Sequence, residues 1–265
     1  MHLVRHVNKK GQVCSRAANT LKVPCISSQT AKKENQKKMG AWISNTEDPL
    51  TSFTATPLTA IGEKHVRRTP TTLRIKAAEG IWATGDHYIT EADTDEPQYT
   101  LERIGDKLRV MHADTGKTVA YVVLMKYAMR KSAQYLVLPA HAVHTPLADM
   151  HSVAVMQVDV ALGWYQFTMD VTSLVSGLAI HGVVHNSARS ARFFHGPSVL
   201  QQEAKAELIA KSTWEFSWKL ESIYRLQVAG GVDLAMTSVL VCIMNHVRVK
   251  IAGGRTDTLP ALLGS

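Results

Sequence analysis

The longest apolar run of the chain follows two glycines and reads Gly230-Gly231-Val232-Asp233-Leu234-Ala235-Met236-Thr237-Ser238-Val239-Leu240-Val241-Cys242-Ile243-Met244. Its apolar residues cover nearly every face of a helix. Asp233 suits the helix start, because a carboxylate there accepts hydrogen bonds from free backbone N–H groups. A helix that is apolar on all sides lies in a core or a membrane, and this run is shorter than the ~20 residues that span a bilayer.

We therefore predict a buried central helix over residues 232–245. The residues that we expect in its core contacts are Leu234, Met236, Val239, Leu240 and Ile243. Val247, Val249 and Ile251 alternate with polar residues, so this segment is either the end of the helix or a closing strand.

Short runs of β-branched and aromatic residues precede the helix, separated by Gly, Asp and Pro. The clearest pair, residues 107–112 and 118–123, flanks Asp114-Thr115-Gly116, which predicts a hairpin because Gly supplies the positive φ of such turns. About a dozen short strands favour an antiparallel barrel or sandwich, and the simplest arrangement is a mainly β, closed antiparallel barrel around the C-terminal helix. The expected strands cover residues 73–76, 80–83, 88–90, 99–104, 107–112, 118–123, 135–138, 153–161, 165–169, 178–184, 191–195, 206–211 and 224–228.

The 265 residues suffice for one full core. Residues 1–70 lack apolar periodicity and are rich in Lys, Ser, Thr, Asn and Gln, so we expect a disordered basic leader. The barrel domain is expected over residues 71–252, followed by a disordered tail over residues 253–265.

The formal net charge of +8 resides in the leader. Residues 1–38 hold 9 basic residues and 1 acidic residue, whereas residues 39–265 hold 21 of each. The body of the protein is therefore neutral, and its overall charge gives no reason to expect a specific nucleic-acid partner.

Several protein classes lack their signatures in this sequence. The three cysteines are too few for a disulfide framework, and neither a zinc-site spacing nor a secretory signal occurs. No P-loop, GxGxxG, HExxH or G-x-S-x-G pattern is present, and Cys242 falls inside the apolar helix, where a thiol is inert. We expect an intracellular protein that is not an enzyme and uses no cofactor.

The order of elements resembles a known family. The hairpin over residues 108–120 is similar to the D-x-x-G-x-x-V-A turn of LURP-one-related proteins, as are residues 211–218, residues 223–228 and the helix from Asp233. This resemblance covers roughly residues 74–250. It implies the tubby C-terminal fold, which phospholipid scramblases also resemble, and a non-enzymatic module that contacts phosphoinositides or membranes, used in plants for defence-related signalling. The basic leader and the His-rich segment Pro139–Pro146 depart from the family pattern.

Basic residues of the folded part are the candidates for contact with anionic headgroups, since Arg and Lys pair with phosphate. They are Lys126, Arg130 and Lys131 at one predicted strand corner, Lys211 and Lys219 at the matching corner of the second half, and Arg189 and Arg192 in a third loop. The alternative is an ordinary solvated surface balanced by an equal number of acids.

Two further patterns have simpler interpretations. His141, His144 and His151 follow H-x2-H-x6-H spacing near Asp149, but two prolines mark a loop without a fixed ligand face, and we expect no metal. The aromatic residues at period-2 spacing suit base stacking or, more simply, one buried strand face. They are Trp164, Tyr165 and Phe167 in one segment and Trp214, Phe216 and Trp218 in another.

The leader offers two targeting patterns. Residues 39–44, Met-Gly-Ala-Trp-Ile-Ser, fit the N-myristoylation pattern at Gly40, which requires translation to start at Met39. A basic, acid-poor start is also typical of organellar transit peptides, but this one has no clean amphipathic helix.

We therefore expect a binding or scaffolding module that contacts acidic phospholipids at the cytoplasmic membrane face, in defence or stress signalling. The alternatives are a scramblase-like protein that moves phospholipid and a lipid-independent module that binds signalling proteins. The expected location is the cytoplasm, peripheral at the plasma membrane rather than transmembrane, with the nucleus as the alternative.

Overall fold

The computed structural model describes residues 49–253 except 78–85, 105–106, 129–130, 164–165, 186–189, 197–205 and 216–221, together with two short strands near the N-terminus. The chain divides into two units, residues 1–48 and 49–265. In the first unit, β1 (His6–Val7) pairs antiparallel with β2 (Val13–Cys14).

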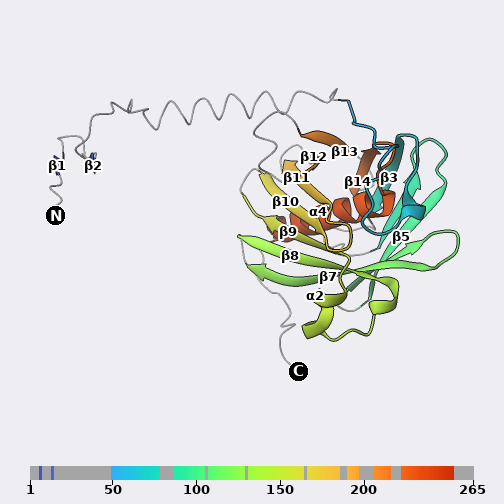
Figure 1. The fold of residues 1–265 in the computed structure, drawn as a ribbon, viewed down its shortest axis with the longest axis horizontal. Helices are drawn as coiled ribbons and strands as arrows, with labels where there is room; N and C mark the ends of the chain where they lie inside the picture. Colours follow the sequence, from blue (N-terminus) through green and yellow to red (C-terminus); the bar gives the residue numbers. More distant parts are fainter. Residues whose placement is uncertain are drawn as a thin grey trace. The chain divides into compact units, whose positions relative to one another are not determined.

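In the described part of the second unit, twelve strands form a closed antiparallel barrel (Figure 1). Each strand pairs with its neighbours in sequence, and β14 closes the barrel on β3. The strands are β3 (Thr71–Ala77), β4 (His87–Glu91), β5 (Pro97–Ile104), β6 (Lys107–His112), β7 (Thr118–Ala128), β8 (Ser132–Pro139), β9 (Met156–Ala161), β10 (Gln166–Ser173), β11 (Ala179–His185), β12 (Ser190–His195), β13 (Glu207–Glu215) and β14 (Ser222–Val228). The predicted barrel is confirmed, and Gly116 has the positive φ (61°) that the predicted hairpin requires.

The predicted central helix is confirmed and longer than expected. α4 (Leu234–Gly253) runs through the barrel (Figure 1), and closed barrels of similar strand number are known to enclose a helix. The prediction ended at residue 245, but Val247 is fully buried, three residues after Met244 and four after Ile243, and so continues the same helix face. The alternation after residue 246 therefore belongs to the helix and not to a closing strand.

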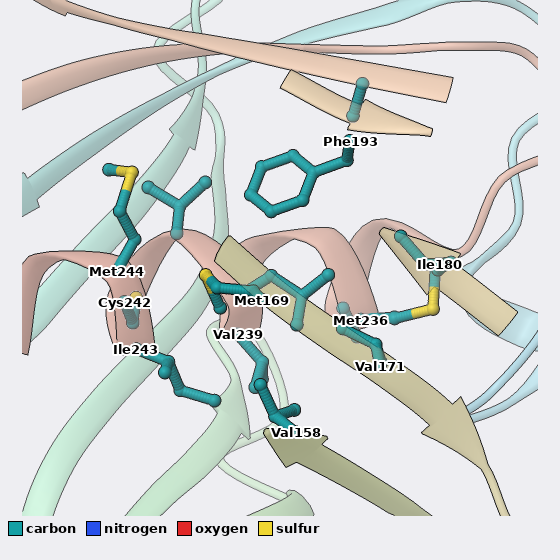
Figure 2. Close-up of a cluster of buried hydrophobic side chains, with 14 of the residues drawn as sticks. Val158, Met169, Val171, Ile180, Phe193, Met236, Val239, Cys242, Ile243 and Met244 are labelled. Atoms are coloured by element: carbon teal, nitrogen blue, oxygen red, sulfur yellow. The ribbon is translucent and has the colours of Figure 1, made fainter. Parts of the chain in front are cut away.

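The helix side chains fill the interior of the barrel. All five residues predicted to make core contacts, namely Leu234, Met236, Val239, Leu240 and Ile243, are at most 3% exposed. Figure 2 shows side chains of the strands, among them Val171 and Phe193, directed toward Met236 and Val239 of the helix. The space inside the barrel is thus occupied by packed apolar side chains.

One predicted strand begins with a helical turn instead. Residues 153–161 were expected to be extended, but Val153 ends α2 (Met150–Val153), and β9 starts only at Met156. This turn belongs to the β8–β9 connection, which also contains the short helices η2 (Ala140–Ala142) and η3 (Leu147–Asp149). Met150 is buried against the outer faces of β7 and β8, so apolar packing outside the barrel favours the helical turn.

The expectation that residues 49–70 lack structure is wrong. Residues 49–68, which we call the strap, lie across one end of the barrel and include the short helix η1 (Glu63–His65). Backbone N–H groups of the strap donate to carbonyls of β13 and of the β14–α4 connection at 2.7–2.8 Å: Thr51 to Leu208, Phe53 to Gly230 and Leu58 to Gly231. The strap has no helical or strand periodicity because its order comes from these bonds to the barrel. Three predicted segments lie outside the described residues of the barrel unit. They are the strand expected over residues 80–83, the leader over residues 1–48 and the tail over residues 254–265.

Asp233 joins the strap to the helix. Its Oδ1 accepts the N–H of Met236 (3.0 Å), and its Oδ2 accepts those of Ala60, Ile61 and Gly62 (2.9–3.3 Å). The carboxylate is fully buried, and its negative charge lies at the positive end of the helix dipole. The predicted helix cap therefore also holds the strap in place.

Candidate functional site

The two ends of the barrel differ in what they expose. The strap covers the end where α4 begins, which we call the strap end. α4 finishes at the other end, the exit end, where Asn245 accepts a hydrogen bond from the Tyr224 hydroxyl near the start of β14 (2.8 Å). The side chain of Arg248 donates to the same hydroxyl and lies over the Tyr224 ring, 5.8 Å from its centroid. Sequence reasoning missed this contact, although the polar residues that end the apolar run were its signal.

A β-bulge turns Lys126 to the outer face of the barrel. Leu124 pairs with Tyr135 of β8, but Lys126 pairs with the next residue, Gln134, so Met125 is an extra residue in β7. Val122 and Leu124 face the core, and strict alternation would place Lys126 there too. Because the bulge shifts the alternation by one residue, Tyr127 packs on the core and Lys126 is exposed.

Two of the three residues at the first predicted corner are described. Lys126 lies near the end of β7 and Lys131 just before β8, and both are exposed. Within the described residues neither ammonium group has a carboxylate partner. Arg130 lies outside the described residues. The structure thus brings Lys126 and Lys131 to the same hairpin end, as predicted.

Further exposed side chains lie at the exit end. Lys76 of β3 is exposed beside Tyr88 of β4, its cross-strand partner, and Arg103 and Ile104 end β5. Tyr88 is 52% and Ile104 44% exposed. We call this set the basic rim; its members are Lys76, Tyr88, Arg103, Ile104, Lys126 and Lys131.

The second predicted corner does not join the first. Lys211 lies in the middle of β13, paired with Arg192 of β12 and Gln227 of β14, and is partly buried. Five strands separate β13 from β7 in either direction around the barrel, so Lys211 is on the opposite side from Lys126. One headgroup therefore cannot contact both corners. Lys219, Arg189 and Gly40 lie outside the described residues.

The histidine, cysteine and aromatic residues singled out in the sequence lie in the β8–β9 connection, in the packed core or outside the described residues. His141, His144 and His151 are exposed in the β8–β9 connection, and among the described residues no three His, Cys, Asp or Glu side chains are grouped as metal ligands. Burial raises the pKa of the Cys242 thiol. Phe167 is buried in the core, and Trp214 packs against it, so these two aromatic residues are packing residues. Trp164, Tyr165, Phe216 and Trp218 lie outside the described part of the chain.

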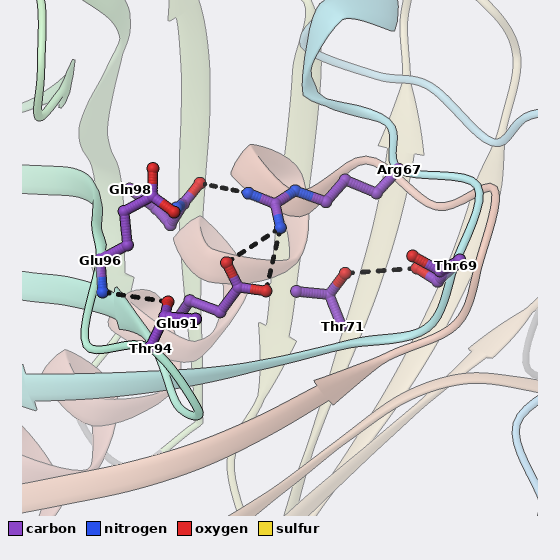
Figure 3. A network of polar contacts seen from close by, with 7 residues as sticks. All are labelled: Arg67, Thr69, Thr71, Glu91, Thr94, Glu96 and Gln98. Atoms are coloured by element: carbon purple, nitrogen blue, oxygen red, sulfur yellow. Dashed lines mark hydrogen bonds and ion pairs between the residues drawn. The ribbon is translucent and has the colours of Figure 1, made fainter.

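Polar side chains at the strap end hold the strap on the barrel. The Arg67 guanidinium donates to both carboxylate oxygens of Glu91 (3.0 and 3.1 Å) and to Oε1 of Gln98 (2.9 Å), as Figure 3 shows. His65 of the strap is buried, with Nδ1 3.0 Å from the Tyr99 hydroxyl. These contacts are a structural network rather than a second ligand site, because its groups bind one another.

The buried His65 makes stability depend on pH. Burial lowers the pKa of His65, an effect that the Asp233 carboxylate opposes. In the unfolded chain a histidine titrates near pH 6.5, so below about pH 6.5 the unfolded state binds the proton more readily. We expect the free energy of unfolding to be highest above about pH 6.5 and to fall as the pH drops through the pKa of folded His65.

Urea unfolding at about pH 7.5 and about pH 5 measures this effect. His65→Gln should reduce the difference between the two pH values, whereas the exposed His151→Gln should not. Some dependence will remain, because burial also lowers the pKa of His185. An undiminished difference in His65→Gln would contradict the assignment to His65.

Comparisons with protein-family models, with curated proteins and with solved structures find no match to this chain. The resemblance to LURP-one-related proteins therefore stays a prediction from the residues quoted above. Among the described residues, no helix has both the length and the apolar character that crossing a membrane requires.

Proposed function

We propose that this chain is a non-enzymatic binding or scaffolding module, of the LURP-one-related and tubby-like kind, that contacts acidic phospholipids through the basic rim. The observation that carries the proposal is the joint exposure of Lys76, Arg103, Lys126 and Lys131 with two large apolar side chains at one barrel end. Such a surface suits a bilayer that is negative at its surface and apolar just beneath it.

The two kinds of side chain would act together. A Lys or Arg near an anionic bilayer contributes about 1 kcal/mol of attraction. Tyr88 and Ile104 can bury apolar area at the headgroup boundary, where aromatic side chains are favoured. Phosphoinositides, with several phosphates per headgroup, are the lipids that the rim suits best. We therefore propose that the module acts at the cytoplasmic face of the plasma membrane.

The scramblase-like alternative requires α4 to enter the bilayer. Its residues Met236, Val239 and Leu240 are fully buried in the barrel, so this would break most of the core. Their burial supports a barrel that stays closed and favours the binding module. The other alternative, a lipid-independent module that binds proteins in signalling or elsewhere, is distinguished by the vesicle experiment.

Neutralising two lysines of the rim should weaken vesicle binding. With the full-length protein we expect Lys126→Gln/Lys131→Gln to bind phosphatidylcholine vesicles containing phosphatidylinositol bisphosphate about thirtyfold less tightly, since two cations contribute about 2 kcal/mol. Co-sedimentation measures the partition coefficient.

The matched control removes two exposed lysines at the strap end, Lys64→Gln/Lys117→Gln. The basic leader is the same in all variants, so its charge cancels in the comparison. An equal loss of vesicle binding in both double variants would mean that only total charge matters, and it would exclude the basic rim as the binding surface. Binding to a protein partner from which lipid has been removed, unchanged by the rim variant, would favour the interaction module.

A further inference from the structure

A shallow surface pocket lies across β7, β8 and β9, which are neighbours in the barrel (Figure 1). Its lining residues are Lys126, Ser132, Ala133, Gln134, Asp159 and Val160. Lys126, Gln134 and Asp159 form one cross-strand row, so the backbones of Lys126 and Asp159 are two strand spacings, about 10 Å, apart. The pocket thus has a cation at one side and a carboxylate at the other.

The carboxylate is held in position by two amides. Nε2 of Gln134 donates to Oδ1 of Asp159 (2.8 Å), and Nε2 of Gln157 donates to Oδ2 (2.6 Å). Each carboxylate oxygen has a second lone pair that these bonds leave open. A group fixed before a ligand arrives loses little entropy on binding. Lys126, turned outward by the bulge, has no carboxylate partner among the described residues.

The opposite charges restrict what the pocket accepts. A simple anion attracted by Lys126 meets the Asp159 carboxylate, and a simple cation attracted by Asp159 meets the ammonium of Lys126. A ligand with both charges meets no like charge, and such repulsion is a common source of specificity.

We propose that this pocket binds a phosphate ester of a primary amino alcohol, such as the phosphoethanolamine or phosphoserine group. The phosphate lies at Lys126, where the hydroxyl of Ser132 provides a further donor, and the ammonium group lies at Asp159. The group comes either from a lipid headgroup or from a soluble molecule. Only the lipid form rests on the membrane contact proposed above.

Isothermal titration of the full-length protein with soluble phosphoethanolamine, inorganic phosphate and ethanolamine tests the pocket. We expect phosphoethanolamine to bind about tenfold more tightly than either fragment. Asp159→Asn should remove this advantage and leave the binding of inorganic phosphate equal or stronger. Lys126→Gln should weaken the binding of both phosphoethanolamine and inorganic phosphate. Lys64→Gln, at the strap end and outside both the pocket lining and the basic rim, is the control and should leave the binding of all three ligands unchanged. Equal binding of phosphate and phosphoethanolamine, or no effect of Asp159→Asn, would overturn the proposal.

Vesicles separate the two sources of the group. Phosphatidylserine and phosphatidylglycerol carry the same net charge, but only the first has an ammonium group. A preference for phosphatidylserine that Asp159→Asn abolishes supports the lipid headgroup, and soluble binding without this preference supports a soluble ligand. The rim variant Lys126→Gln/Lys131→Gln tests membrane contact separately. If this variant loses vesicle binding but the unmodified protein does not discriminate between headgroups, the pocket proposal is overturned and the membrane proposal stands.

Discussion

Asp233→Ala is expected to lower the free energy of unfolding by about 4 kcal/mol. Four backbone N–H groups lose their acceptor, two of these bonds are fully buried, and each buried donor left alone costs about 1–3 kcal/mol. These donors belong to Met236 in the first turn of α4 and to strap residues 60–62. Most small domains have only about 5–15 kcal/mol of stability, so we expect the variant to be largely unfolded or marginal at 25 °C.

Urea unfolding followed by circular dichroism measures this loss. Asp233→Asn gives a graded test, since an asparagine oxygen can still accept at one end but its amide group would face donors at the other. The control is Asp114→Ala in the exposed β6–β7 turn, which should change stability by no more than about 0.5 kcal/mol. If Asp233→Ala were as mild as Asp114→Ala, the carboxylate would not be the link between the strap and the helix.

Leu240→Ala is expected to destabilise the protein by about 2–5 kcal/mol. Leu240 is fully buried in the middle of α4 and is surrounded by strands. A barrel closed by hydrogen bonds on every side cannot contract around the missing atoms, so we expect a loss toward the upper end of this range. The same unfolding measurement applies, with the slope of free energy against urea showing whether the folded state is still compact.

Two variants bracket this effect. Leu240→Met conserves volume and should cost less than about 1.5 kcal/mol. Leu147→Ala removes the same atoms from a side chain that is 59% exposed in the β8–β9 connection, and should be nearly neutral. Similar losses in Leu147→Ala and Leu240→Ala would be incompatible with a helix packed in the interior.

The central helix and most strands were predictable because their signals are local. An apolar run too short for a bilayer has to be buried, and period-2 alternation between turn residues indicates strands. The predicted corner at Lys126 and Lys131 was also local, since both residues flank one hairpin. The Val153 error had the opposite cause: apolar residues that pack outside the barrel look in sequence like those of a strand.

The strap could not be predicted from periodicity. Its order comes from single backbone bonds and from isolated apolar side chains such as Leu58, which packs on the core. The contact between the strap and the barrel also explains why residues 230 and 231 are both glycine, in addition to their role as a helix breaker. A Cβ at Gly231 would lie 2.3 Å from the Phe53 carbonyl carbon, and one at Gly230 would lie 2.3 Å from the Arg68 carbonyl oxygen.

Hydrophobic periodicity and helix capping act between residues close in the chain, and they were enough to predict a mainly β fold around an apolar helix capped by Asp233. Which partners these residues have follows from the tertiary structure. It ties Asp233 to the strap, separates Lys211 from Lys126 by half the barrel, and uses the bulge at Met125 to bring Lys126 into the same cross-strand row as Gln134 and Asp159. Strand register and barrel closure set these distances, and neither follows from the spacing of residues along the chain.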